Sequence, residues 1–168
     1  EDNPVLTYQY SGWMNNDGIA DLDEEPTVST TIDELSGVGT YADSIILSGG
    51  AAENYAFNLV PGNFEITKAQ LTVKADKKTK TYGNPNPELT YSYSGWVNGV
   101  EPIDIEPQIS TTLTDSSAVG FYFDAIKLKG GLDNNYELQL QPGDFKINKA
   151  ILYLTATNTS KVYGHPNP

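Results

Sequence analysis

The sequence lacks most of the residues that carry metal, redox and phosphate chemistry. Its 168 residues include no cysteine, no arginine and one histidine, and ten lysines face 22 acidic residues for a formal net charge of −12. The absence of cysteine excludes disulfides and thiolate metal sites, and the absence of arginine excludes guanidinium clamps. The scarcity of positive charge argues against nucleic-acid binding. No apolar run is long enough for us to expect membrane insertion of this segment.

The negative charge is concentrated in the first part of the chain. Residues 1–65 contain 12 acidic residues and no lysine, whereas residues 66–168 contain ten acidic residues and ten lysines. Five carboxylates fall within residues 17–25. Because Ca²⁺ prefers oxygen ligands, Asp17, Asp21 and Asp23 are candidate metal ligands, and Ca²⁺ is the one cofactor that the sequence suggests. The EF-hand pattern is absent, so a solvated acidic surface is the alternative.

The chain consists of two copies of one sequence pattern. Residues 4–13 return at 87–96, an offset of 83, and the remainder returns at an offset of 81. The period is too long for a solenoid coil and suits one small domain per repeat. Both repeats end on a Tyr-Gly motif, at Tyr82-Gly83 and Tyr163-Gly164. We therefore expect repeats at 1–68 and 69–149, residues 150–168 as the leading strand of a following repeat, and neighbouring repeats of the same protein as partners.

The local pattern is that of β-strands throughout. Leu71, Val73 and Ala75 alternate with polar residues, and turn signals recur every 8–12 residues. The pattern predicts an all-β fold of two tandem small antiparallel domains, sandwich-like, with five to six strands each. Residues 64–76 are predicted to form one continuous linking strand. The helix candidates are short, at 17–24 and 33–36, and β-grasp-like α+β modules are the alternative.

Residues 66–91 carry a linked set of motifs. They are Ile66-Thr67-Lys68-Ala69, then Leu71, Val73 and Ala75-Asp76, then Lys80-Thr81-Tyr82-Gly83-Asn84-Pro85-Asn86-Pro87 and Leu89-Thr90-Tyr91, with Gly120, Tyr122 and Asn135-Tyr136 later in the chain. This set resembles the MBG repeat of the YGX type, found in long secreted multi-repeat bacterial surface proteins, often called adhesins. The resemblance implies an extracellular, cell-surface location and a non-catalytic stalk or spacer in cell adhesion.

A direct binding function is the alternative to a spacer. Trp13 and Trp96 each follow a Ser-Gly pair at the end of an expected strand. Exposed tryptophan can stack on sugars, so both are candidate ligand-binding residues for mucin-type glycans or a host surface protein. Because they recur at equivalent positions, a core or interface plug is the other interpretation. An enzyme is not expected, since the lone His165 cannot serve a repeated triad.

The points in the repeat pattern at which this sequence starts and stops predict self-association. If the strand after Ala69 belongs to the repeat that follows it, residues 1–65 lack a leading strand and Ile151–Val162 is a spare one. An unpaired strand beside an incomplete sheet favours strand addition between molecules. This predicts head-to-tail association through Ile151–Val162. The alternative is two complete modules, 1–83 and 84–168, and a monomer.

Overall fold

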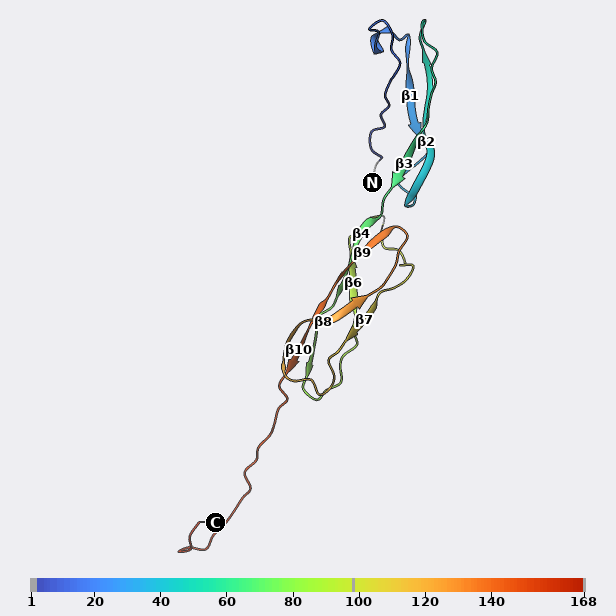
Figure 1. Cartoon of the computed structure of the whole chain (residues 1–168). Helices are drawn as coiled ribbons and strands as arrows, with labels where there is room; N and C mark the ends of the chain where they lie inside the picture. Colours follow the sequence, from blue (N-terminus) through green and yellow to red (C-terminus); the bar gives the residue numbers. More distant parts are fainter. Residues whose placement is uncertain (1–2, 98, 168) are drawn as a thin grey trace. The chain divides into compact units, whose positions relative to one another are not determined.

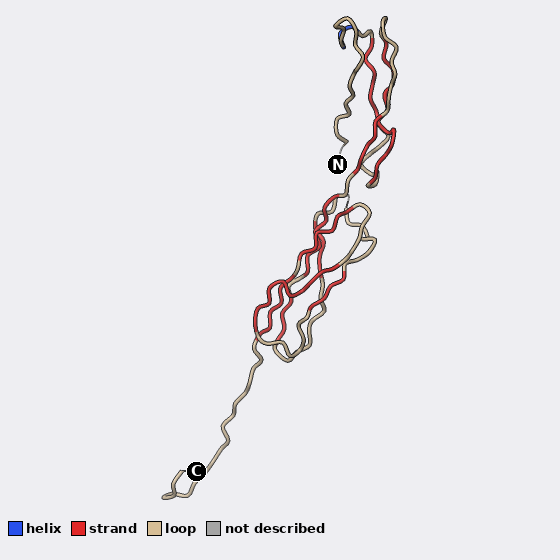
Figure 2. Tube along the Cα trace, viewed as in Figure 1, coloured by secondary structure: helices blue, strands red, loops and turns tan. Residues whose placement is uncertain are grey.

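The computed structural model describes residues 3–97 and 99–167. Among them lie ten strands and one 3₁₀ turn (Figures 1 and 2). The elements are η1 (Ile19–Asp21), β1 (Glu24–Thr30), β2 (Gly39–Ala51), β3 (Gly62–Ile66), β4 (Ala69–Ala75), β5 (Lys78–Thr81), β6 (Tyr91–Ser94), β7 (Gln108–Thr111), β8 (Gly120–Lys129), β9 (Tyr136–Gln141) and β10 (Gly143–Asn148). No described helix has the length and apolar character needed to cross a membrane.

The chain divides into two compact units. The first comprises Glu1–Val73, Tyr93–Gln108 and Lys129–Leu140. The second comprises Lys74–Ser92, Ile109–Leu128 and Gln141–Pro168. The strands form three sheets, with orders β1-β2-β3, β5-β10-β8-β7 and β6-β4-β9. The expected all-β class is therefore confirmed.

The sheet of the first repeat is a three-stranded antiparallel meander. Val28 of β1 lies opposite Leu47 of β2, and Tyr41 of β2 lies opposite Phe64 of β3. The register shifts between Tyr41 and Ile45, where Asp43 has a φ of 53°. A bulge of this kind twists and bends the strand that carries it. In the described part of the chain no strand pairs with the outer edge of β3.

The second repeat repeats this meander in β7, β8 and β10 and adds further strands. β5 pairs with β10 in parallel, Phe145 opposite Lys78 and Ile147 opposite Lys80. This pair departs from the antiparallel pattern predicted from sequence. In the second unit, Ala75, Ile126, Phe145 and Ile147 form a buried core. In the first unit, Leu71, Ile103 and Tyr136 form another.

Two details differ from the sequence prediction. The first repeat has three strands and the second has seven, rather than five to six each. The linking strand is interrupted, since β3 ends at Ile66 and β4 begins at Ala69. Ile66 still pairs with Gly39 of β2, whereas the Ala69 N–H donates to the Asn135 carbonyl at 3.0 Å. The chain changes hydrogen-bond partners over the two intervening residues, and this change breaks the strand.

The two predicted short helices are also reduced in the structure. Within residues 17–24 the one helical turn is the three-residue η1, and Glu24 already begins β1. Residues 33–36 form a turn in which the Ser36 N–H donates to the Asp33 carbonyl at 3.2 Å. Asp and Ser side chains compete with the helix for backbone hydrogen bonds, and Gly loses more backbone entropy in a helix, so such segments favour turns.

Equivalent core positions are buried to different depths in the two repeats. Phe145 and Ile126 are fully buried, whereas their counterparts Phe64 and Ile45 are half-buried. Within residues 3–66 only Pro26 and Ile32 are buried. The first repeat therefore has the meander but not a closed core.

We expect Phe145→Ala to lower the free energy of unfolding by about 3–5 kcal/mol, because it removes a fully buried ring. The matched change, Phe64→Ala, should cost about 1–2 kcal/mol, since that ring already contacts water. Urea unfolding of the full chain, followed by tryptophan fluorescence and circular dichroism, measures both. Equal losses in the two variants would contradict the difference in burial.

Candidate functional site

Each tryptophan packs against two tyrosine rings. The Trp13 ring centre is 5.3 Å from those of Tyr10 and Tyr55. The Trp96 ring centre is 5.5 Å from that of Tyr93 and 5.3 Å from that of Tyr136. In each cluster the second tyrosine meets the indole nearly edge-on, an arrangement that aromatic quadrupoles favour. Both indoles are half-buried, so each is part of a packed cluster rather than an isolated exposed platform.

The two clusters differ in what covers them. In the second repeat Leu71 of β4 is fully buried in the core against which Tyr93, Trp96 and Leu138 pack. In the first repeat a groove of about 370 Å³ opens at the corresponding place. Its lining includes the counterparts of the residues around Leu71, namely Tyr10, Trp13, Leu22, Tyr55 and Phe57. We call these five residues and the space they enclose the aromatic groove; it corresponds to the position that Leu71 fills in the second repeat.

The polar groups of the two clusters also differ. The Tyr93 hydroxyl donates to the Glu106 carboxylate. The Tyr10 hydroxyl is shielded from water and has no hydrogen-bond partner among the described residues. The neighbouring Tyr8 hydroxyl, followed by desolvation, raises the pKa of Tyr10 to about 12. Tyr10 is therefore neutral at physiological pH, and the aromatic groove has an uncharged lining at this point.

Two of the three acidic residues predicted as metal ligands accept hydrogen bonds from nearby donors. The Asp17 carboxylate accepts from the Tyr55 hydroxyl at 2.7 Å, and the Asp21 carboxylate accepts from the Gly18 N–H at 2.8 Å. Among the described residues no three metal-ligating side chains lie together as a metal site. The structure thus does not bring Asp17, Asp21 and Asp23 together, and Ca²⁺ binding at them stays a prediction.

The Asp17 contact also affects the tyrosine that lines the aromatic groove. The Met14 N–H donates to the Tyr55 hydroxyl oxygen and lowers the pKa of Tyr55. The Asp17 carboxylate and desolvation act in the opposite direction and raise it above its usual value. Tyr55 therefore keeps its proton and holds the acidic loop against the groove.

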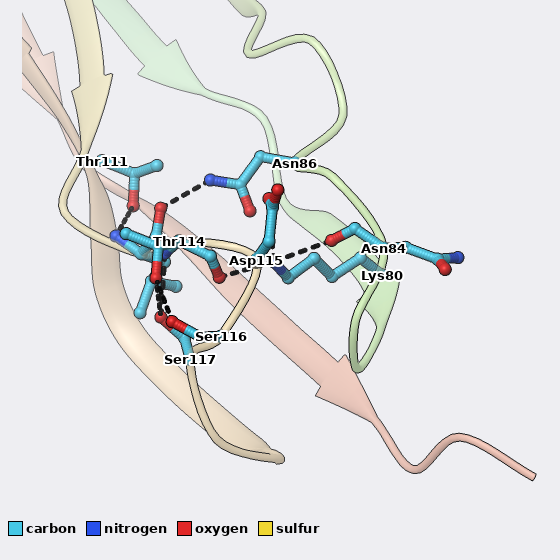
Figure 3. Close-up of polar contacts among 9 residues, drawn as sticks. Lys80, Asn84, Asn86, Thr111, Thr114, Asp115, Ser116 and Ser117 are labelled. Carbon is cyan, nitrogen blue, oxygen red and sulfur yellow. Dashed lines mark hydrogen bonds and ion pairs between the residues drawn. The ribbon is translucent and has the colours of Figure 1, made fainter.

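A buried lysine that the sequence reasoning missed anchors the end of β5 (Figure 3). Lys80 is 6% exposed. Its Nζ donates to the Thr114 carbonyl at 2.7 Å and to the Asn84 carbonyl at 3.1 Å, and it lies 4.0 Å from Asp115 Oδ1. A buried ammonium needs such acceptors to offset its lost hydration. The sequence feature that marks this position is a lysine two residues before each Tyr-Gly motif: Lys80 precedes Tyr82, and Lys161 precedes Tyr163.

The family comparison agrees with the repeat. The family model described as MBG domain (YGX type) matches residues 1–65 and residues 71–146. The chain belongs to the MBG family. The match confirms the resemblance noted from the motifs, and it makes this MBG pair a repeat module of a kind found in surface proteins. The family is in general a non-catalytic structural module. No curated protein and no solved structure matches the chain.

We expect Lys80→Met to lower the free energy of unfolding by about 1–3 kcal/mol, because it leaves the Thr114 and Asn84 carbonyls without their charged donor. The matched change Lys161→Met should leave the stability of the free chain unchanged, since Lys161 is exposed and, among the described residues, its Nζ donates only to the exposed Asn167 side chain, at 2.7 Å. Thermal unfolding of both variants beside the wild type provides the comparison. A Lys80→Met variant as stable as the wild type would show that the ammonium is dispensable.

Proposed function

We propose that this MBG pair is a non-catalytic spacer in the adhesive stalk of a bacterial surface protein, outside the cell. The observation that supports the proposal is the structural role of the residues that recur in both repeats. They pack the aromatic clusters and shape the turns, and a spacer needs such fold-maintaining residues in every copy.

The Tyr-Gly motif shows this use most clearly. Gly83 has a φ of +86°, and the Asn84 N–H donates to the Thr81 carbonyl at 3.0 Å. Gly164 has a φ of +89°, and the His165 N–H donates to the Val162 carbonyl at 3.1 Å. Glycine adopts this left-handed backbone without steric cost. The motif is therefore a repeated turn, and its chemistry offers no reactive group.

The surface charge suits an array of such repeats. Residues 1–65 have a net charge of −12 and residues 66–168 are neutral apart from His165. Large net charge of one sign keeps proteins soluble and discourages random contact. The second repeat has the same meander without the charge, so the charge is not needed for the fold.

Direct binding of a glycan or host protein is the second candidate, and the aromatic groove is the observation that favours it. Its 370 Å³ volume and tyrosine and tryptophan lining are compatible with a stacked sugar ring. The corresponding region of the second repeat is occupied by Leu71. A binding function would therefore belong to the first repeat alone.

A surface-display experiment separates the two candidates. Anchored alone on a non-adherent bacterium, the chain should confer no adhesion to host cells and retain no mucin-type glycan on an array. Placed between the anchor and an unrelated binding domain, it should preserve the adhesion that the domain confers. Saturable glycan retention that Trp13→Ala abolishes and Trp96→Ala leaves intact would replace the spacer by a binding module.

A further inference from the structure

We propose that the outer face of the four-stranded sheet in the second repeat docks on the outer face of the first repeat's sheet in a second copy of this chain. The sheets concerned are β5-β10-β8-β7 and β1-β2-β3. The outer face of each is the side whose residues alternate with the core residues. The proposal goes beyond the spacer function and does not rest on it, because it concerns which surfaces of neighbouring copies lie against each other.

The second repeat exposes two phenylalanines on its outer face. Phe121 and Phe123 alternate along β8 with Tyr122, which packs against the core. Phe121 is 40% exposed and Phe123 is 78% exposed, and their ring centres lie 4.6 Å apart. Lys77 Nζ lies 4.6 Å from the centre of the Phe121 ring, and the exposed Lys146 of β10 is paired with Phe121. We call Phe121, Phe123 and Lys146 the phenylalanine face. Exposed aromatic rings beside charged groups are typical of an interaction surface.

The first repeat has small and acidic residues at the same positions. At the offset of 81, Thr40, Ala42 and Glu65 correspond in turn to the three residues of the phenylalanine face. All three are exposed, and we call them the glutamate face. Thr40 is paired with Glu65 across β2 and β3 in the same register as the phenylalanine face. The strand pairing therefore needs neither the rings nor the lysine, and the two repeats differ here in the surface that they present.

The two repeats show these outer faces beside different neighbours. The second repeat follows another repeat and has its own leading strands, β4 and β5, and its phenylalanine face is exposed. The first repeat precedes another repeat, and one compact unit contains it together with the adjoining residues 69–73, 93–108 and 129–140. Its glutamate face is exposed in that unit. Neither a leading strand nor an adjoining repeat thus covers the outer face.

The two faces complement each other in size and charge. Stacked sheets lie about 10 Å apart, and large side chains on one sheet fit best over small ones on the other. Stacking β8 over β2 places Phe121 over Thr40. The same stacking places β10 over β3 and Lys146 over Glu65. Among the described residues, neither of these two charged side chains has an ion-pair partner, so the contact gives each a partner that its own chain does not provide.

Other acidic residues on this side of the sheets belong to a bulge that both repeats share. The Asp144 carboxylate accepts from the Asp124 N–H at 3.2 Å. In the first repeat the Asn63 side-chain oxygen accepts from the Asp43 N–H at 3.0 Å. The two faces therefore differ chiefly in the ring pair and in the charge at positions 146 and 65.

Pairing of unlike faces is favoured over pairing of like faces. Two phenylalanine faces would bring the Lys146 side chains of both copies together, and two first repeats repel each other because each has a net charge of −12. The proposed contact instead joins an acidic repeat to one whose charges balance. It is heterologous, so copies join either reciprocally in pairs or one after another.

Sedimentation velocity of the full chain over a wide concentration range tests the proposal. The wild type should associate reversibly. The double variant Phe121→Thr/Phe123→Ala, which copies the residues of the first repeat, should associate about a hundredfold more weakly, since it removes both rings from the contact. It should remain folded because both rings are exposed, and circular dichroism checks this.

Charge reversal tests which groups meet. Lys146→Glu and Glu65→Lys should each weaken association about tenfold, because each change brings like charges together in the docked pair. An equimolar mixture of the two variants should associate as the wild type does, since each altered face then meets the opposite charge on the other variant. The control Lys74→Glu makes the same charge change at an exposed position of β4, in the other sheet, and should stay within about twofold of the wild type.

Several outcomes would overturn the proposal. One is a wild type that is monomeric at every concentration. Another is a phenylalanine or charge variant that associates as the wild type does. A mixture of the two charge variants that associates no better than either alone would also count against it. Equal weakening by Lys74→Glu would indicate a general effect of net charge in place of a specific contact.

Discussion

The second repeat depends on the burial of one face of β4. Leu71 and Val73 are fully buried, and Ala75 nearly so. Leu71 belongs to the core with Ile103 and Tyr136, and Ala75 belongs to the core with Phe145. Burying an aliphatic side chain contributes about 1.5–3 kcal/mol relative to exposing it, which is large beside the net stability of a small domain. The described part of the first repeat has the same meander without this strand. Its Leu22, Tyr55 and Phe64, which correspond to Ile103, Tyr136 and Phe145, are only half-buried.

The comparison between repeats shows which features could be predicted from sequence and why others could not. The alternation at Leu89, Tyr91 and Tyr93 and that at Leu6, Tyr8 and Tyr10 are alike, and both predict a strand. Only Tyr91–Ser94 forms one, because β4 pairs with it. The pattern specifies which side chains share a face, and the partner strand decides whether a ladder forms. The all-β class and the presence of two MBG repeats follow from the pattern, whereas strand number depends on pairing.

Some features of the candidate site could likewise be predicted from the sequence, and others could not. The tryptophans were identifiable because they recur after Ser-Gly in both repeats. The aromatic groove beside Trp13 was not, because it depends on how the described strands pair, and none of them lies where β4 lies in the second repeat. The burial of Lys80 was also not predictable, since its acceptor Thr114 lies 34 positions away. Among the described residues the acidic side chains close in sequence do not gather into a metal cluster, and the Asp17 and Asp21 carboxylates accept hydrogen bonds from Tyr55 and Gly18 instead.

The distribution of charge gives the acidic first repeat a physical role. Two copies of the first repeat repel each other, because residues 1–65 contain no lysine and no arginine. The excess of carboxylates on the first repeat therefore opposes side-by-side aggregation through the exposed aromatic groove, whereas the balanced charges of the second repeat give no such repulsion.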